Sequence, residues 1–277
     1  MKIGICAPSA PFTREDAKKV CALAVTSHPS AELIFHDQCF AEAGHFAGSD
    51  AQRLSAFVEM ANNPALDAVW FARGGYGACR IAEDAVQQLG DAADAKIYMG
   101  YSDAGNMLGA LYKAGIGAPV HGPMPADIRR DGGDAAIIRA LGWLVEKNPD
   151  GLEPDIVPSQ RVAAFNLTTL AMMVGTPIMP DLRGHMLLIE EVSEYLYAFD
   201  RAMFHVTSHL AHAGLAGIRL GRVSDVPEND RPFGEDAVEI VKRWCAKSAI
   251  EFCGSADLGH DSQNRIVPFG APPEERG

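Results

Sequence analysis

A serine that could act as a nucleophile stands in the tetrapeptide Gly100-Tyr101-Ser102-Asp103, between a predicted strand and a predicted helix. Residues 95–99 are apolar enough for a buried strand, and residues 104–114 carry apolar side chains at helical spacing. On such a turn the hydroxyl is exposed, and N–H groups of the helix start face any anion formed beside it. This is the layout of a hydrolase nucleophile, although Ala104 stands where the common elbow has glycine. A Ser-Asp pair is also an ordinary helix N-cap, and the turn alone leaves both interpretations open.

A serine nucleophile needs a general base and an acid that orients the base. His260 lies in a polar loop after a predicted strand end, where a histidine is more often an ordinary surface residue. His121 competes with it because it lies closer to Ser102 in the chain. Glu190 and Glu191 end an apolar run, so a carboxylate there can point into a cleft, while a solvated pair is the simpler interpretation.

The glycine-rich segment Arg73-Gly74-Gly75-Tyr76-Gly77 follows another predicted strand. A dinucleotide fingerprint read from Gly75 would need glycine where the chain has Arg80, and the sequence contains no P-loop motif. The glycines do allow backbone N–H groups to approach a ligand closely, as an oxyanion hole or a carboxylate site requires. A tight turn that needs positive φ angles is the alternative explanation.

The histidines and cysteines do not predict a metal site. His205, His209 and His212 share one face of a predicted helix, but the glutamate of an H-E-x-x-H site is missing, which favours a polar or subunit-contact face. The cysteines lack the close pairs of a disulfide framework or a zinc site, and none is the expected nucleophile. They are Cys6, Cys21, Cys39, Cys79, Cys245 and Cys253.

The composition is that of an ordinary globular protein of 277 residues, with 48% hydrophobic and 22% charged residues. A formal net charge of -12 argues against nucleic acid or an anionic membrane as a partner. No apolar run approaches the roughly 20 residues of a membrane span. The N-terminus lacks the apolar stretch of a secretory signal, so we expect a cytoplasmic protein.

Strands and helices alternate along the first half of the chain, which predicts a parallel sheet covered on both faces. Ligands gather at the carboxyl ends of such strands, so the glycine-rich loop and Ser102 should lie on the same edge. The predicted strands of this half cover residues 2–6, 32–36, 66–72 and 95–99.

A segment rich in proline and turn residues, 147–160, predicts a linker between two domains. The first, residues 1–146, is expected to be a parallel α/β sandwich that carries the serine. The second, residues 161–277, is expected to be a smaller mixed α/β domain. Its predicted strands cover residues 186–189, 217–223 and 265–269, and its predicted helices cover residues 195–215 and 234–249.

With Ser102, Glu190 and His260 in view, the chain resembles the LD-carboxypeptidases, serine peptidases that recycle murein peptides. The resemblance runs nearly end to end through short motifs in the family's order, which together are far more specific than any one of them. The motifs are Ala7-Pro8-Ser9, Phe46-Ala47-Gly48-Ser49-Asp50 with Arg53, residues 72–78 with Arg80, Gly100-Tyr101-Ser102-Asp103, His121-Gly122-Pro123-Met124, Asn166-Leu167 with Gly175-Thr176-Pro177, Leu188-Ile189-Glu190-Glu191 with Asp200-Arg201, and Gly259-His260 with Asn264 and Pro268-Phe269-Gly270.

The resemblance implies a catalytic triad of serine, glutamate and histidine in this chain order, which corresponds to Ser102, Glu190 and His260. The N-terminal domain would supply the serine and the C-terminal domain the other two, so the active site would form at the domain junction. We expect the backbone N–H groups of Asp103 and Gly75 to form the oxyanion hole.

The implied reaction is release of the terminal D-alanine from the murein tetrapeptide, next to meso-diaminopimelate, through an acyl-enzyme and without metal or cofactor. The family also implies a homodimer. Arg73, Tyr76 and Asn166 are the expected substrate-binding residues. Ala164-Phe165 stand where the family usually has two glycines, and Leu196 stands near a usual proline, so fine specificity is not carried over.

Other functions fit part of the sequence. The microcin C immunity peptidases use the same triad on a peptidyl-nucleotide, but they are typically longer, and no aromatic loop for a nucleobase stands out here. A non-catalytic two-domain binding protein would explain the glycine loops but not the match at all three catalytic positions. An α/β-hydrolase is disfavoured because the G-x-S-x-G elbow and the HGGG loop are missing.

Overall fold

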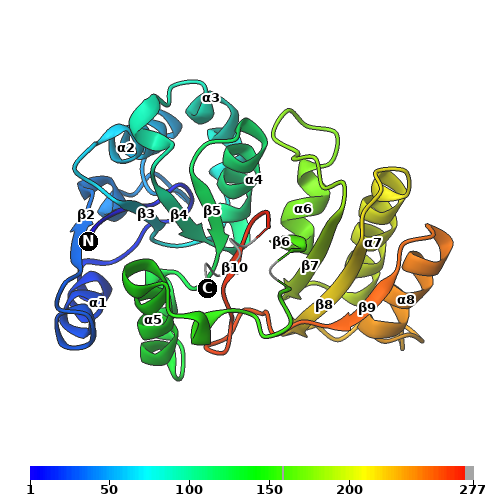
Figure 1. The fold of residues 1–277 in the computed structure, drawn as a ribbon. Coiled ribbons are helices and arrows are strands. Elements are labelled where there is room, and N and C mark those ends of the chain that lie inside the picture. The colour runs from blue at the N-terminus through cyan, green and yellow to red at the C-terminus, as the bar shows by residue number, and fades with distance from the viewer. Residues whose placement is uncertain (158, 272–277) are drawn as a thin grey trace.

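The computed structural model of the protein describes residues 1–157 and 159–271. Its larger sheet has six strands (Figure 1). The strand order is β10-β5-β4-β3-β1-β2, and all neighbours are parallel except β10, which runs antiparallel to β5. The order reverses between β1 and β3, and ligands bind outside the carboxyl ends of strands at such a reversal. The strands are β1 (Lys2–Cys6), β2 (Glu32–Phe35), β3 (Ala68–Phe71), β4 (Ile97–Gly100), β5 (Ala118–His121) and β10 (Val267–Pro268).

Helices cover both faces of this sheet because its strands alternate side chains between two cores. In β3, Ala68 and Trp70 belong to the core under α1 and α5. Val69 and Phe71 belong to the opposite core, under α2, α3 and α4. The helices are α1 (Arg14–Ser27), α2 (Asp50–Asn62), α3 (Ala82–Val86), α4 (Gly105–Ala114) and α5 (Gly133–Leu141).

A second, smaller sheet has four parallel strands in the order β6-β7-β8-β9. Three helices pack on it and share their hydrophobic core with its strands (Figure 1). The elements are β6 (Arg161–Asn166), α6 (Leu167–Met173), β7 (His185–Val192), α7 (Leu196–Leu210), β8 (Gly217–Ser224), α8 (Ala237–Lys247) and β9 (Phe252–Ser255). The predicted α/β class, with a parallel sheet and a smaller second sheet, is therefore confirmed.

The two sheets meet along the helix that follows the candidate nucleophile. A Cβ on Gly109 of α4 would lie 2.9 Å from Met173 Sδ of α6, and one on Gly105 would lie 3.3 Å from Thr169 Cγ2. These glycines therefore let α4 and α6 approach closely. The arrangement brings the start of α4, and the serine before it, beside the second sheet.

The end of the chain returns to the larger sheet. Residues 265–269 were expected to form a strand of the second domain, but β10 pairs with β5 instead (Figure 1, red segment). Gly270 and Val162 also exchange two backbone hydrogen bonds of 2.9 and 3.0 Å, which link this segment to β6. The segment that leads from the second sheet to β10 contains His260. Among the described residues, no helix is both long and apolar enough to cross a membrane.

Candidate active site

Ser102 occupies a strained turn between β4 and α4. Its φ angle is 59°, in the left-handed region that non-glycine residues seldom adopt, and such strain is concentrated at functional sites. The predicted placement of the serine between a strand and a helix is confirmed. A Cβ on Gly100 would lie 3.1 Å from Ala104 Cβ. The missing side chain of Gly100 thus leaves room for Ala104, which stands where the common elbow has glycine.

The glycine-rich loop after β3 passes directly over Ser102. A Cβ on Gly74 would lie 2.9 Å from Ser102 Oγ and 3.5 Å from the Asp103 nitrogen. Only glycine allows this approach, which brings the peptide between Gly74 and Gly75 close to the serine and to the Asp103 N–H. Gly75 itself has a φ angle of 115°, so the tight turn that was the alternative explanation for the glycines is present as well.

The side chain of Asp103 ties the serine turn to two neighbouring loops. Its Oδ2 accepts hydrogen bonds from Ser9 Oγ at 2.6 Å and from the Ala78 N–H at 2.9 Å, and its Oδ1 accepts one from Asn106 Nδ2 at 3.1 Å. Burial raises the pKa of Asp103 despite these bonds. Ser9 follows β1, so the carboxyl ends of β1, β3 and β4 converge on this residue. Ser9 appeared in the sequence only as part of a motif, with no signal of this contact.

His260 and Glu190 form a buried pair. His260 Nδ1 lies 2.6 Å from Glu190 Oε2, with side-chain exposures of 8% and 0%. Burial raises the pKa of Glu190, against the opposing effect of the imidazole. His260 Nε2 and Glu190 Oε1 are buried and have no hydrogen-bond partner among the described residues. The histidine is therefore not an ordinary surface residue, and its second ring nitrogen is free for a ligand or substrate.

Tyr101 supports the imidazole from one side. The ring centroids of Tyr101 and His260 are 4.9 Å apart, and the Tyr101 hydroxyl donates to Asp127 Oδ1 at 2.7 Å. Tyr101 appeared in the sequence only as part of the motif around Ser102, and Asp127 was not singled out. The hydroxyl bond holds the tyrosine ring in place, and the ring in turn limits the orientations open to His260.

His121, the competing base, is fully buried at the end of β5. Its Nε2 lies 3.2 Å from Asn264 Oδ1, and burial lowers the pKa of His121 to about 4. The residue is not part of the pocket that holds Ser102. The structure therefore favours His260 over His121 as the partner of the serine.

Glu191, next to Glu190 in β7, points to different partners. Its carboxylate accepts hydrogen bonds from Asn166 Nδ2 at 2.6 Å, from the Thr168 N–H at 2.8 Å and from the Val192 N–H at 2.9 Å. Both glutamates are buried, so the simpler interpretation of a solvated pair is wrong. The adjacent carboxylates therefore have separate partners: Glu190 contacts His260, and Glu191 binds the start of α6.

A pocket of about 310 Å³ joins the candidate residues. Ser102 and His260 line it together, but no hydrogen bond connects their side chains within residues 1–157 and 159–271. The other lining residues are Arg73, Gly74, Gly75, Tyr101, Met124, Ala126, Asp127, Arg129 and Arg130. A larger groove of about 950 Å³ elsewhere on the protein contains none of the predicted site residues.

Three residues were expected to bind substrate, and the structure brings one of them into this pocket. Arg73 lines it, and its Nη1 donates to the Pro11 carbonyl at 3.1 Å. Tyr76 lies outside the lining, is 51% exposed and packs on Phe46 with ring centroids 6.0 Å apart. Asn166 also lies outside the lining, since its amide caps α6 through the Thr169 N–H and binds Glu191.

The three histidines of the remaining candidate cluster are exposed, but they do not share one helix. His205 and His209 lie on the solvent side of α7, whereas His212 lies beyond its end at Leu210, so the predicted helix over residues 195–215 was too long. The part of the chain that the structure describes contains no group of three or more His, Cys, Asp or Glu side chains arranged to hold a metal ion.

The fold and its relatives define an α/β peptidase. The chain belongs to the LD-carboxypeptidase family, whose N-terminal domain matches residues 3–122 and whose C-terminal domain matches residues 161–274. A putative carboxypeptidase of Synechocystis sp. is 30% identical over 253 residues, 89% of this chain and 82% of the relative. The murein tetrapeptide carboxypeptidase of Pseudomonas aeruginosa is 28% identical over 244 residues, 82% of this chain and 78% of the relative.

Solved structures share the fold over nearly the whole chain. Muramoyltetrapeptide carboxypeptidase from Oxalobacter formigenes has a TM-score of 0.79 at 24% identity, over 96% of this chain and 93% of that one. The microcin C7 self-immunity protein MccF has a TM-score of 0.78 at 19% identity, over 97% of this chain and 91% of that one. These likenesses describe the fold and do not distinguish between the two activities.

Proposed function

We propose that the protein is a serine-type LD-carboxypeptidase that hydrolyses the bond between meso-diaminopimelate and the terminal D-alanine of the murein tetrapeptide. The observation that carries the proposal is the environment of the His260 ring. One ring nitrogen contacts the buried carboxylate of Glu190, and the other is buried without a partner among the described residues. The same ring lines the pocket of Ser102. This is the arrangement that a general base of a serine nucleophile needs.

In the proposed reaction, Ser102 Oγ attacks the amide carbon while His260 Nε2 takes the hydroxyl proton. Glu190 holds the Nδ1 proton and stabilises the imidazolium that forms. The C–N bond then breaks as Nε2–H protonates the leaving amine of D-alanine. Water attacks the acyl-enzyme in the second half of the reaction, with His260 again as base, and the shortened peptide leaves with a free carboxylate.

The proposed oxyanion hole consists of the backbone N–H groups of Asp103 and Gly75. The close approach of Gly74 to Ser102 supports it, because the loop and the start of α4 then flank the oxygen that becomes negative. Each donor of this kind lowers the barrier by roughly 3 kcal/mol. The loop is therefore as important to the proposed mechanism as the base.

Arg73 is the proposed ligand of the substrate's terminal carboxylate. Of the three arginines that line the pocket, Arg129 is paired with Asp16 at 2.7 Å and Arg130 with Asp127 at 2.8 Å. Arg73 forms no carboxylate ion pair within the described ranges. It thus provides the positive charge of the pocket that an incoming carboxylate can neutralise.

The proposal extends the family resemblance to the setting of the reaction: a cytoplasmic homodimer that acts on murein peptides during peptidoglycan recycling. The reaction as written needs no metal and no cofactor. Sedimentation of the purified protein at several concentrations tests the dimer independently of the activity.

The decisive experiment is mass spectrometry of the murein tetrapeptide after incubation with the wild type and with Ser102→Ala. Loss of one D-alanine with the wild type alone supports both the activity and the nucleophile. Equal loss with both proteins refutes the serine mechanism. No loss with either refutes the murein substrate, and hydrolysis of an acyl-nucleotide would then favour the microcin-type activity. A fluorophosphonate that fails to label Ser102 would favour a non-catalytic binding protein.

A further inference from the structure

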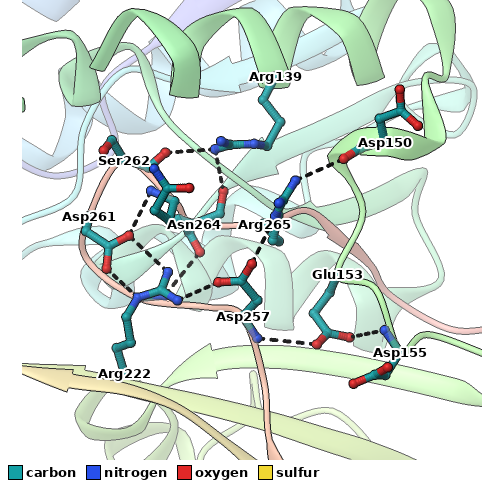
Figure 2. A network of polar contacts seen from close by, with 12 residues as sticks. Arg139, Asp150, Glu153, Asp155, Arg222, Asp257, Asp261, Ser262, Asn264 and Arg265 are labelled. Atoms are coloured by element: carbon teal, nitrogen blue, oxygen red, sulfur yellow. Dashed lines mark hydrogen bonds and ion pairs between the residues drawn. The ribbon is translucent and has the colours of Figure 1, made fainter. Parts of the chain in front are cut away.

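The His260 loop, residues 257–265, lies between β9 and β10 and is held by arginines on opposite sides (Figure 2). Arg139 of α5 donates from Nη1 to the carbonyls of Ser262 and Asn264 at 2.9 and 3.0 Å. Arg222 of β8 reaches the loop from the side of the second sheet (Figure 2). The loop contains no helix or strand, and these contacts help to hold its backbone in place.

Arg222 holds the loop on both sides of His260. Its Nε and Nη2 bind the two carboxylate oxygens of Asp261, the second at 2.9 Å, and its Nη1 donates to Asp257 Oδ1 at 2.5 Å. The Arg222 backbone N–H also donates to the Leu258 carbonyl at 2.7 Å. A guanidinium that binds a carboxylate through two parallel bonds sets orientation as well as distance, which a lysine cannot reproduce.

The guanidinium of Arg222 also lies against the backbone that precedes His260. A Cβ on Gly259 would lie 2.7 Å from Arg222 Nε and 3.1 Å from Asp261 Oδ2. One residue earlier in β8, a Cβ on Gly221 would lie 2.8 Å from the Leu258 carbonyl oxygen and 3.0 Å from Glu190 Cβ. The strand that carries Arg222 therefore contacts both the loop of the proposed base and the proposed acid.

We propose that Arg222 is a positioning residue for His260. The hydrogen bond to Glu190 orients the ring through Nδ1, but one hydrogen bond does not determine where the histidine backbone lies. The Arg222 side chain contributes to that placement, because it binds the carboxylates of residues 257 and 261 on either side of the histidine, while Arg139 holds the far end of the loop. The consequence is that the His260 ring lines the pocket of Ser102 with Nδ1 bound to Glu190 and Nε2 left for the substrate side of the proposed reaction. This inference rests on the proposed function, in which His260 is the general base.

The test compares Arg222→Ala and Arg222→Lys with a matched control, Arg243→Ala. Arg243 binds two carboxylates, Asp200 at 2.5 Å and Glu235 at 2.8 Å, and lies on α8, so its removal breaks a comparable ion network outside the candidate pocket. The readouts are kcat and KM on the murein tetrapeptide, and hydrogen exchange of the amides in residues 257–265.

For Arg222→Ala we expect kcat to fall about 100-fold, because misplacement of a catalytic group by ~1 Å costs that much. KM should change less than about twofold, since binding contacts are unaffected. Arg222→Lys should lose less than Arg222→Ala, and added methylguanidinium should restore part of the activity of Arg222→Ala. Exchange in the His260 loop should accelerate in Arg222→Ala and stay unchanged in Arg243→Ala.

An equal loss of kcat in Arg243→Ala, or wild-type kcat in Arg222→Ala, would overturn the positioning role while leaving the proposed function intact. If the wild type releases no D-alanine, the proposed function fails instead. In that case hydrogen exchange of the amides in residues 257–265 still tests whether Arg222 holds the His260 loop. Unchanged exchange in Arg222→Ala would show that the arginine does not hold the His260 loop.

Discussion

The buried histidine behind the candidate site should make the protein sensitive to mild acid. His121 is fully buried, its Nε2 contacts Asn264, and its Nδ1 has no partner in the described part of the chain. Burial lowers the pKa of His121 from 6.5 to about 4. Between these two values the unfolded chain binds a proton that the folded chain does not, so stability falls as pH falls.

The magnitude follows from the two pKa values. Linkage gives a loss of about 2 kcal/mol from His121 alone between about pH 7 and about pH 5, and about 3 kcal/mol by about pH 4. Well above pH 6.5, the ordinary value, the histidine is neutral in both states and the contribution disappears. A loss of this size is a large part of the stability of a typical domain, roughly 5–15 kcal/mol.

Urea unfolding at about pH 7 and about pH 5 measures this effect in the wild type, His121→Gln and His209→Gln. Glutamine can place an amide donor near Asn264 but cannot be protonated. We therefore expect His121→Gln to lose ~2 kcal/mol less on acidification than the wild type. His209 is exposed, so its variant should show the same pH dependence as the wild type. Equal loss of stability on acidification in His121→Gln and the wild type would refute the argument that proton uptake by His121 in the unfolded chain destabilises the folded protein at low pH.

Other substitutions test the pocket directly. Arg73→Gln should raise KM for the free-acid tetrapeptide by ~10-fold or more, because a hydrogen bond to a charged group contributes ~1.5–3 kcal/mol. KM for the same peptide with an amidated C-terminus should not change. Equal effects on acid and amide would exclude carboxylate recognition. Gly74→Ala should lower kcat/KM by about 100-fold, since its Cβ would lie 2.9 Å from Ser102 Oγ and must displace the serine or the loop; full activity would contradict the close approach. Ser102→Gly should stabilise the inactive protein by ~0.5–1 kcal/mol relative to Ser102→Ala, because the left-handed conformation at φ 59° costs non-glycine residues ~1–2 kcal/mol. Calorimetry that shows no difference would mean that the turn is unstrained.

Much of the fold could be predicted because it depends on local pattern. Apolar runs of strand length and helical spacing located β1, β3, β4 and α4 close to their observed bounds, and they located the start of α7 but not its end. Strand β5, which contains Pro119, was not predicted, and neither were β6, β9 and the helices α3, α5 and α6. The last strand was predicted, but its partner could not be, since β10 and β5 are far apart in sequence.

The candidate site divides in the same way. Ser102 on its turn and the glycine loop were visible because strand, turn and helix follow one another in the chain. The resemblance, and not the spacing of residues, selected Glu190 and His260. Nothing local indicated that Asn166 would cap α6 and bind Glu191, or that Arg222 would hold the His260 loop.

By itself, the sequence determined which chemistry each side chain can perform and where the chain turns, because both depend on residue type and immediate neighbours. Only the tertiary structure decided which groups meet. His260 and Glu190 are 70 residues apart, and Ser9 and Asp103 are 94 apart, yet each pair is joined by a 2.6 Å hydrogen bond. Burial, which raises the pKa of Glu190 and lowers that of His121, also exists only after the two sheets have packed.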